Sequence, residues 1–179
     1  MQNEKWKTDF ILHFSFLILH WCFMVRVLFV CLGNICRSPT AEGVFRRLVV
    51  EQGLVAEIEV ASAGTHGYHI GAPPDPRARR AAQQRGIDIS GLRGRQATAA
   101  DIQRFDYVLA MDRENLENLL EICPPGHEHK IRLLLEYAPQ RPEREVPDPY
   151  FGGANGFDRV LDMVDEAARG LLDEIRRRS

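Results

Sequence analysis

The residues best suited to do chemistry lie in one short stretch, VCLGNICRSP, at positions 30–39. This stretch follows an apolar run and ends where a helical pattern begins. A loop between a strand and a helix N-terminus directs backbone N–H groups and the positive end of the helix dipole into one small space, which favours anions. Gly33 allows a close approach of the backbone, and Asn34 tolerates a left-handed conformation. Arg37 adds a planar fork for two oxygens of a phosphate-like group.

Cys31 ends the apolar run, six positions before Arg37. Thiols at helix N-termini and beside cations lose their protons more readily than ordinary cysteines, and the Ser38 hydroxyl can donate to a thiolate. The loop therefore predicts a thiolate nucleophile facing a bound tetrahedral oxyanion, as in phosphoryl transfer to sulfur. A buried cysteine that ends a strand is the simpler alternative, and the neighbouring Gly33, Asn34, Arg37 and Ser38 disfavour it. The nucleotide-binding pattern GxxxxGK[ST] is absent, so ATP is not the expected ligand.

Length and composition are those of one globular domain. The chain has 179 residues, of which 45% are hydrophobic and 27% charged, and its net charge of −2 gives no field that would favour nucleic acid. The arginine-rich run 77–85 predicts a solvated helix face, with a basic binding patch as the alternative. The cysteines match neither a disulfide framework nor a zinc site, and with a reactive thiol among them they indicate a reducing cytoplasm. They are Cys22, Cys31, Cys36 and Cys123.

Strand and helix patterns alternate along the chain, which is typical of βαβ units, a parallel sheet and helices on both of its faces. Ligands bind beyond the carboxyl ends of the strands in such sheets, and Cys31 lies at one of these ends. Asp75 is the expected cap of one helix, and Asn155 of the last. Strands are predicted at 24–31, 58–64, 105–111 and 129–138, and helices after Ser38, Asp75, Thr98, Asp112 and Asn155.

VCLGNICRSPTAE resembles the active-site signature of the low-molecular-weight protein tyrosine phosphatases, C-x5-R followed by Ser-Pro. The resemblance continues in the same order through 62–78, 105–116 and the DPY stretch 148–150, and it covers nearly all of residues 24–179. It implies an α/β fold with a single domain over 24–179. Its sheet would have four parallel strands flanked by helices on both faces, in the flavodoxin-like or Rossmann-like three-layer arrangement. No metal and no organic cofactor are implied.

The resemblance also implies an activity: hydrolysis of phosphotyrosine in proteins, and of small aryl phosphates, through a cysteinyl-phosphate intermediate. Cys31 would be the nucleophile, Arg37 the phosphate clamp and Asp148 the general acid and then base, with Asp112 as supporting structure. Judged by its neighbours alone, Asp148 in PDPY is more readily a turn residue. The residues implied to bind the substrate are Leu32, Gly33, Asn34, Ile35, Cys36 and Ser38 in the loop, and Tyr68 and Tyr150 as aromatic walls.

Three other functions are compatible with parts of this pattern. Arsenate reductases share the loop but need further cysteines to relay a disulfide outward, and here only Cys123 lies downstream. Phosphoarginine phosphatases of the same family typically have Thr where this chain has Ile35. A non-catalytic phosphate-binding module would lack a nucleophile or an acid, and both are present.

Residues 1–23 extend beyond the resemblance and are not expected to belong to the domain. The apolar stretch 10–23 is shorter than the about 20 residues of a membrane span, and it lacks the cleavage site of a signal peptide. We therefore expect Met24 to be the natural start, with a peripheral membrane anchor as the alternative. Membrane association is not otherwise expected.

Overall fold

In a computed structural model of the protein, residues 24–151 and 155–178 are described, and the expectations about residues 1–23 lie outside them. The described part contains one four-stranded sheet, in which all strands are parallel and the order is β2-β1-β3-β4. The α/β class and the parallel sheet predicted from the sequence are thereby confirmed. The strands are β1 (Val25–Cys31), β2 (Ile58–Gly64), β3 (Tyr107–Ala110) and β4 (Ile131–Leu133).

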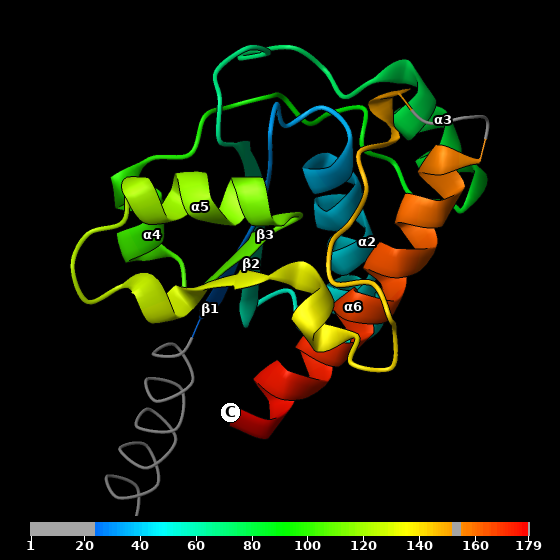
Figure 1. The fold of residues 1–179 in the computed structure, drawn as a ribbon. Coiled ribbons are helices and arrows are strands. Elements are labelled where there is room, and N and C mark those ends of the chain that lie inside the picture. Colours follow the sequence, from blue (N-terminus) through cyan, green and yellow to red (C-terminus); the bar gives the residue numbers. More distant parts are fainter. Residues whose placement is uncertain (1–23, 152–154, 179) are drawn as a thin grey trace, which may run out of the picture.

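Helices cover both faces of this sheet (Figure 1), as the sequence predicts. One layer packs on the face that holds Val27 and Phe29, and the other packs on the face that holds Leu28 and Val30. The first layer is α2 (Arg37–Glu51), α3 (Pro76–Gln84) and α6 (Gly156–Arg178), and the second is α4 (Ala99–Arg104) and α5 (Arg113–Glu121).

β1 is buried on both faces because alternate side chains of a strand point to opposite sides. Its residues 27–30 are fully inaccessible to solvent. Phe29 meets Phe45 of α2 edge to face, with ring centroids 5.7 Å apart. This packing fixes the strand that ends in Cys31.

Capping residues set several helix boundaries as the sequence predicts. The Asp75 carboxylate accepts from the Arg77 N–H at 2.8 Å, one residue before α3 begins at Pro76. Thr98 and Asp101 form a reciprocal capping box at the start of α4. Asn155 directly precedes α6, and its carbonyl oxygen accepts from the Arg159 N–H at 3.1 Å.

The fourth strand is shorter than the predicted 129–138. β4 ends at Leu133, and the chain then forms a 3₁₀ turn, η2 (Leu134–Tyr137). A strand would place Leu134 and Leu135 on opposite faces, whereas in the turn both are fully buried in the core cluster on the α6 side. Packing against α6 therefore outweighs the β-propensity of this segment.

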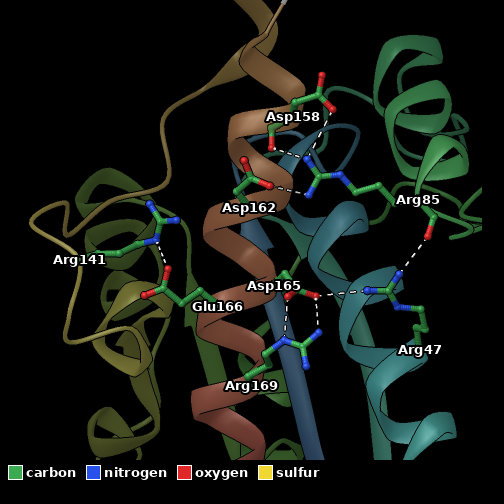
Figure 2. A network of polar contacts seen from close by, with 8 residues as sticks. All are labelled: Arg47, Arg85, Arg141, Asp158, Asp162, Asp165, Glu166 and Arg169. Carbon is green, nitrogen blue, oxygen red and sulfur yellow. Dashed lines mark hydrogen bonds and ion pairs between the residues drawn. The ribbon is translucent and has the colours of Figure 1, made fainter.

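Charged side chains tie α6 to the other two helices of its layer (Figure 2). Arg85, just after α3, pairs with Asp162 at 2.6 Å and donates to the Asp158 carbonyl at 3.2 Å. Arg47 of α2 donates to the Arg85 carbonyl at 3.0 Å and pairs with Asp165 at 3.2 Å. Part of the arginine-rich run is therefore bonded between helices and does not simply form a solvated face. These contacts fix the first turns of α6.

None of the helices in the described ranges is long and apolar enough to cross a membrane.

Candidate active site

Cys31 lies at the carboxyl edge of the sheet, at the last position of β1 and opposite Gly64 of β2. The loop then runs from Leu32 to Cys36, and α2 begins at Arg37. A Cβ on Gly64 would lie 2.9 Å from the Leu32 carbonyl oxygen. Glycine at this position therefore lets the loop fold closely over the end of β2.

Asn34 holds the loop in shape from behind. Its φ of 56° is the left-handed conformation that the sequence predicts for it. Its side-chain amide nitrogen donates to the hydroxyls of Ser38 and Ser62, each at 2.9 Å, and its amide oxygen accepts from the Arg95 N–H at 3.0 Å. Asn34 is buried, so these bonds are shielded from water.

The Ser38 hydroxyl lies 3.1 Å from the sulfur of Cys31. It also lies 3.2 Å from the Ala63 carbonyl oxygen, and it accepts from Asn34. A hydroxyl has a single proton. When Cys31 is a thiolate, its sulfur can only accept, so Ser38 must direct its proton to the sulfur for this contact to be a hydrogen bond.

Arg37 is buried, and its guanidinium contacts two segments of the chain, one at Asp112 and the other at 146–148. Nη1 donates to the Asp112 carboxylate and to the Val146 carbonyl oxygen at 3.1 Å, and Nη2 pairs with Asp148 at 3.4 Å. Burial acts to lower the pKa of this guanidinium, but the charges of Cys31, Asp112 and Asp148 outweigh it and raise that pKa. Arg37 therefore remains a cation in the folded protein.

Asp112 and Asp148 differ in how they are held. Asp112 caps α5 by accepting from the Asn115 N–H at 2.7 Å, and its side chain is 19% exposed. Asp148 accepts from the Tyr150 N–H at 3.0 Å, at the start of the turn η3 (Pro149–Phe151), and its side chain is 40% exposed. Asp148 also borders the pocket described next, whereas Asp112 lies behind Arg37 and supports it.

A pocket of about 240 Å³ opens over the loop. It brings together the predicted nucleophile, clamp and acid with both predicted aromatic walls. Asn34 and Ser38 do not line it, because their side chains are buried behind the loop. The lining residues are Cys31, Leu32, Gly33, Ile35, Cys36, Arg37, Tyr68, His69, Asp148 and Tyr150.

His69 is a pocket residue that the sequence did not single out. A Cβ on Gly33 would lie 2.9 Å from the His69 ring, so the glycine gives the ring its place over the loop. Beside it, His66 and Tyr68 stack with centroids 5.0 Å apart. The sequence signal that could have identified His69 is the group of three aromatic side chains, His66, Tyr68 and His69, in the glycine- and proline-rich loop after β2.

Cys36 shares the pocket with Cys31 but has a different environment. Burial raises the pKa of the Cys36 thiol to about 12, with further contributions from the charges of Asp75, Cys31 and Asp148. Cys36 is therefore a neutral thiol near pH 7. Among the described residues, no cluster of three or more His, Cys, Asp or Glu side chains could hold a metal ion.

Residues 26–179 match the family model described as low molecular weight phosphotyrosine protein phosphatase. The human low molecular weight phosphotyrosine protein phosphatase is 42% identical over 154 residues, which cover 83% of this chain and 94% of that protein. The Bacillus subtilis low molecular weight protein-tyrosine-phosphatase YfkJ is 40% identical over 154 residues, which cover 86% of this chain and 97% of that protein.

Solved structures agree with these matches. The crystal structure of B. subtilis YfkJ superposes with a TM-score of 0.83 at 39% identity, covering 87% of this chain and 97% of that one. A protein tyrosine phosphatase from Entamoeba histolytica, with Hepes in its active site, superposes with a TM-score of 0.82 at 38% identity. The superposition covers 86% of this chain and 97% of that one. The chain belongs to the low-molecular-weight phosphotyrosine protein phosphatase family.

Proposed function

We propose that this phosphatase hydrolyses phosphotyrosine in proteins, and small aryl phosphates, through a cysteinyl-phosphate formed on Cys31. The observation that carries the proposal is one pocket that holds a cysteine at the end of β1, a buried arginine and a partly exposed carboxylate. These are the nucleophile, the anion clamp and the proton donor that phosphoryl transfer to sulfur needs.

The first step transfers the phosphoryl group. The loop carbonyl oxygens of Cys31, Leu32 and Ile35 accept from the neighbouring Thr65, His66 and Asp75 N–H groups. With these carbonyls bonded to the surrounding segments, the loop N–H groups and Arg37 bind the phosphate oxygens. The Cys31 sulfur attacks phosphorus, the bond to the phenolic oxygen breaks, and Asp148 gives its proton to that oxygen.

The second step regenerates the enzyme. Asp148, now a carboxylate, removes a proton from a water molecule that attacks the cysteinyl-phosphate. Inorganic phosphate leaves and Cys31 returns as a thiolate. The Ser38 hydroxyl, 3.1 Å from the sulfur, stabilises this thiolate by donating to it.

The pocket walls favour an aromatic leaving group. Tyr68 and Tyr150 flank the opening and are 69% and 45% exposed, so their rings can cover a phenyl group between them. Ile35 adds an apolar surface at the loop.

Arsenate reduction is not supported. Of the free cysteines at described positions, Cys31 and Cys36 pack on the α2 and α6 side of the sheet, whereas Cys123 packs against the α4 and α5 side. The sheet therefore separates Cys123 from the loop, and a disulfide relay through it has no path.

The test compares three substrates on the purified protein: a phosphotyrosine peptide, the same peptide with phosphoarginine in place of phosphotyrosine, and arsenate with a thiol reductant. We expect phosphate release from the first peptide to be much faster than from the second, and no arsenite formation. Preferential hydrolysis of phosphoarginine, or reduction of arsenate, would contradict the proposal. Loss of activity in Cys31→Ser ties the reaction to this site.

We further propose that the protein works in a reducing compartment such as the cytoplasm on tyrosine-phosphorylated proteins, without nucleic acid or membrane partners. The support is chemical. Cys31, Cys36 and Cys123 are free thiols in the structure, and the reaction requires Cys31 as a thiolate, which an oxidising compartment would consume.

A further inference from the structure

Arg77 lies outside the pocket lining, in the first turn of α3, yet it contacts the segment that carries Asp148. Its Nη1 donates to the Tyr150 carbonyl oxygen at 3.1 Å. Its guanidinium carbon lies 5.1 Å from the centre of the Tyr150 ring and 5.0 Å from the centre of the Phe157 ring. One cation therefore touches the backbone of the turn, an aromatic wall of the pocket and the start of α6.

The guanidinium is itself held in place by Asp75. Its Nε and Nη2 donate to the two Asp75 carboxylate oxygens at 3.0 and 2.9 Å, and this pairing lowers the pKa of Asp75. A bidentate pair fixes the plane of the guanidinium as well as its position. The Asp75 N–H in turn donates to the Ile35 carbonyl oxygen at 2.8 Å. A continuous chain of contacts thus runs from the catalytic loop through Asp75 and Arg77 to Tyr150.

The other side of the cation rests on a fixed part of the fold. Phe157, the second residue of α6, is buried. The residues that follow it in the helix are bonded to Arg85, through the Asp158 carbonyl oxygen and the Asp162 carboxylate (Figure 2). Asp148, by contrast, is 40% exposed and meets Arg37 at 3.4 Å, a long contact. Its position therefore depends on the turn that Arg77 holds.

We propose that Arg77 is a positioning residue: it fixes the turn 148–151 against the catalytic loop and thereby sets where Asp148 delivers its proton. The inference rests on the proposed function, in which Asp148 protonates the leaving group. Proton transfer requires the carboxyl group within hydrogen-bond reach of the leaving oxygen. When the turn is released, the acid step slows, while attack by Cys31 on the bound phosphate is unaffected.

The test uses leaving groups that differ in their need for a proton. Phenyl phosphate expels a basic phenolate, whereas 2,4-dinitrophenyl phosphate expels an anion that is stable without a proton. For Arg77→Ala, we expect kcat/KM for phenyl phosphate to fall about tenfold, a fraction of the about 10²–10⁴ that general acid catalysis supplies. For the dinitro substrate we expect a change within about twofold. The matched control is Arg80→Ala, because Arg80 is exposed on the same helix and, among the described residues, forms no hydrogen bond or ion pair with the turn 148–151.

Arg77→Lys tests whether the bidentate hydrogen bonding of the guanidinium is needed or whether a positive charge is enough. Lysine can keep a cation near the Tyr150 ring but cannot hold a bidentate pair with Asp75 and the carbonyl bond together. We expect the kcat/KM of Arg77→Lys for phenyl phosphate to lie between the values of the wild type and of Arg77→Ala. A smaller amount of folded enzyme would lower the apparent kcat/KM for both substrates by the same factor. Equal losses on both substrates, or no loss on phenyl phosphate, would overturn the proposal.

Asp148→Asn, measured in parallel, shows which idea has failed. If it has the leaving-group effect and Arg77→Ala does not, the role of Arg77 is wrong and the acid assignment stands. If Asp148→Asn has no such effect, the acid is misassigned and the role of Arg77 falls with it. If Cys31→Ser remains active, the proposed reaction itself is wrong.

Discussion

The carboxylate of Asp148 lies 3.4 Å from the guanidinium of Arg37, although 111 positions separate the two residues in the chain. The chain beyond η2 returns to the end of the sheet at which the loop between β1 and α2 lies (Figure 1). Asp148 therefore pairs with one guanidinium nitrogen of Arg37, while Asp112 pairs with the other. The predictions below follow from this arrangement and from the loop around it.

Cys31→Ser should reduce kcat to below about a thousandth of the wild-type value, because loss of the nucleophile leaves only binding and electrostatic contributions. Phosphate binding should persist, since Arg37 and the loop N–H groups are intact and the thiolate charge that repels the anion is gone. Steady-state kinetics and calorimetric titration with phosphate measure the two effects. Cys123→Ser, on the other side of the sheet, is the control and should be near wild type. A Cys31→Ser protein with substantial turnover would refute the nucleophile assignment.

Asp148→Asn should lower kcat by about 10²–10⁴ with little effect on KM, because asparagine neither gives a proton to the leaving group nor takes one from water. The first step needs Cys31 as the attacking thiolate and Asp148 as the proton donor, so the loss in Asp148→Asn should be much smaller for substrates whose leaving groups are stable without a proton. Steady-state kinetics with aryl phosphates of different leaving groups measure this dependence. If Asp112→Asn showed this leaving-group dependence instead, Asp112 would be the acid.

Cys36 should control recovery from oxidation. Peroxide converts a thiolate to a sulfenic acid. The Cys36 thiolate can then attack the Cys31 sulfur, form a disulfide and release hydroxide. Since the pKa of Cys36 is about 12, its thiolate fraction and the rate of disulfide formation should rise about tenfold per pH unit across the neutral range. Mass spectrometry of peroxide-treated protein follows the disulfide.

Cys36→Ser provides the check on this recovery. Without the second thiol, the oxidised Cys31 should proceed to irreversible acids, and less activity should return with dithiothreitol. Recovery equal to that of the wild type, or a disulfide rate independent of pH, would count against this role of Cys36.

Gly64→Ala should weaken phosphate binding. The added methyl group would lie 2.9 Å from the Leu32 carbonyl oxygen and 3.1 Å from the Gly33 carbonyl carbon, so the loop must shift. Overpacking of this kind costs about 1–3 kcal/mol, and we expect the inhibition constant of phosphate to rise several-fold. Gly91→Ala is the matched control, because a methyl group there meets nothing within 4 Å. Unchanged inhibition in Gly64→Ala would mean that the loop tolerates displacement.

The sequence alone determined the local features of this protein. The strand that ends in Cys31, the left-handed Asn34 and the capping residues Asp75 and Thr98 were all predictable, because each depends on residues a few positions away. The alternation of strands and helices likewise defined the parallel sheet and the edge at which the loop lies.

Only the tertiary structure decided which distant side chains meet. Asp112 and Asp148 both flank turns or helix starts in the sequence, and their neighbours do not show that one supports Arg37 from behind while the other borders the pocket. The sequence also gave no reason to separate Arg77 from its arginine-rich run, or to place His69 over Gly33. These relations arise because packing of α3 and α6 on the sheet, rather than any local propensity, sets the positions of the loops at its edge.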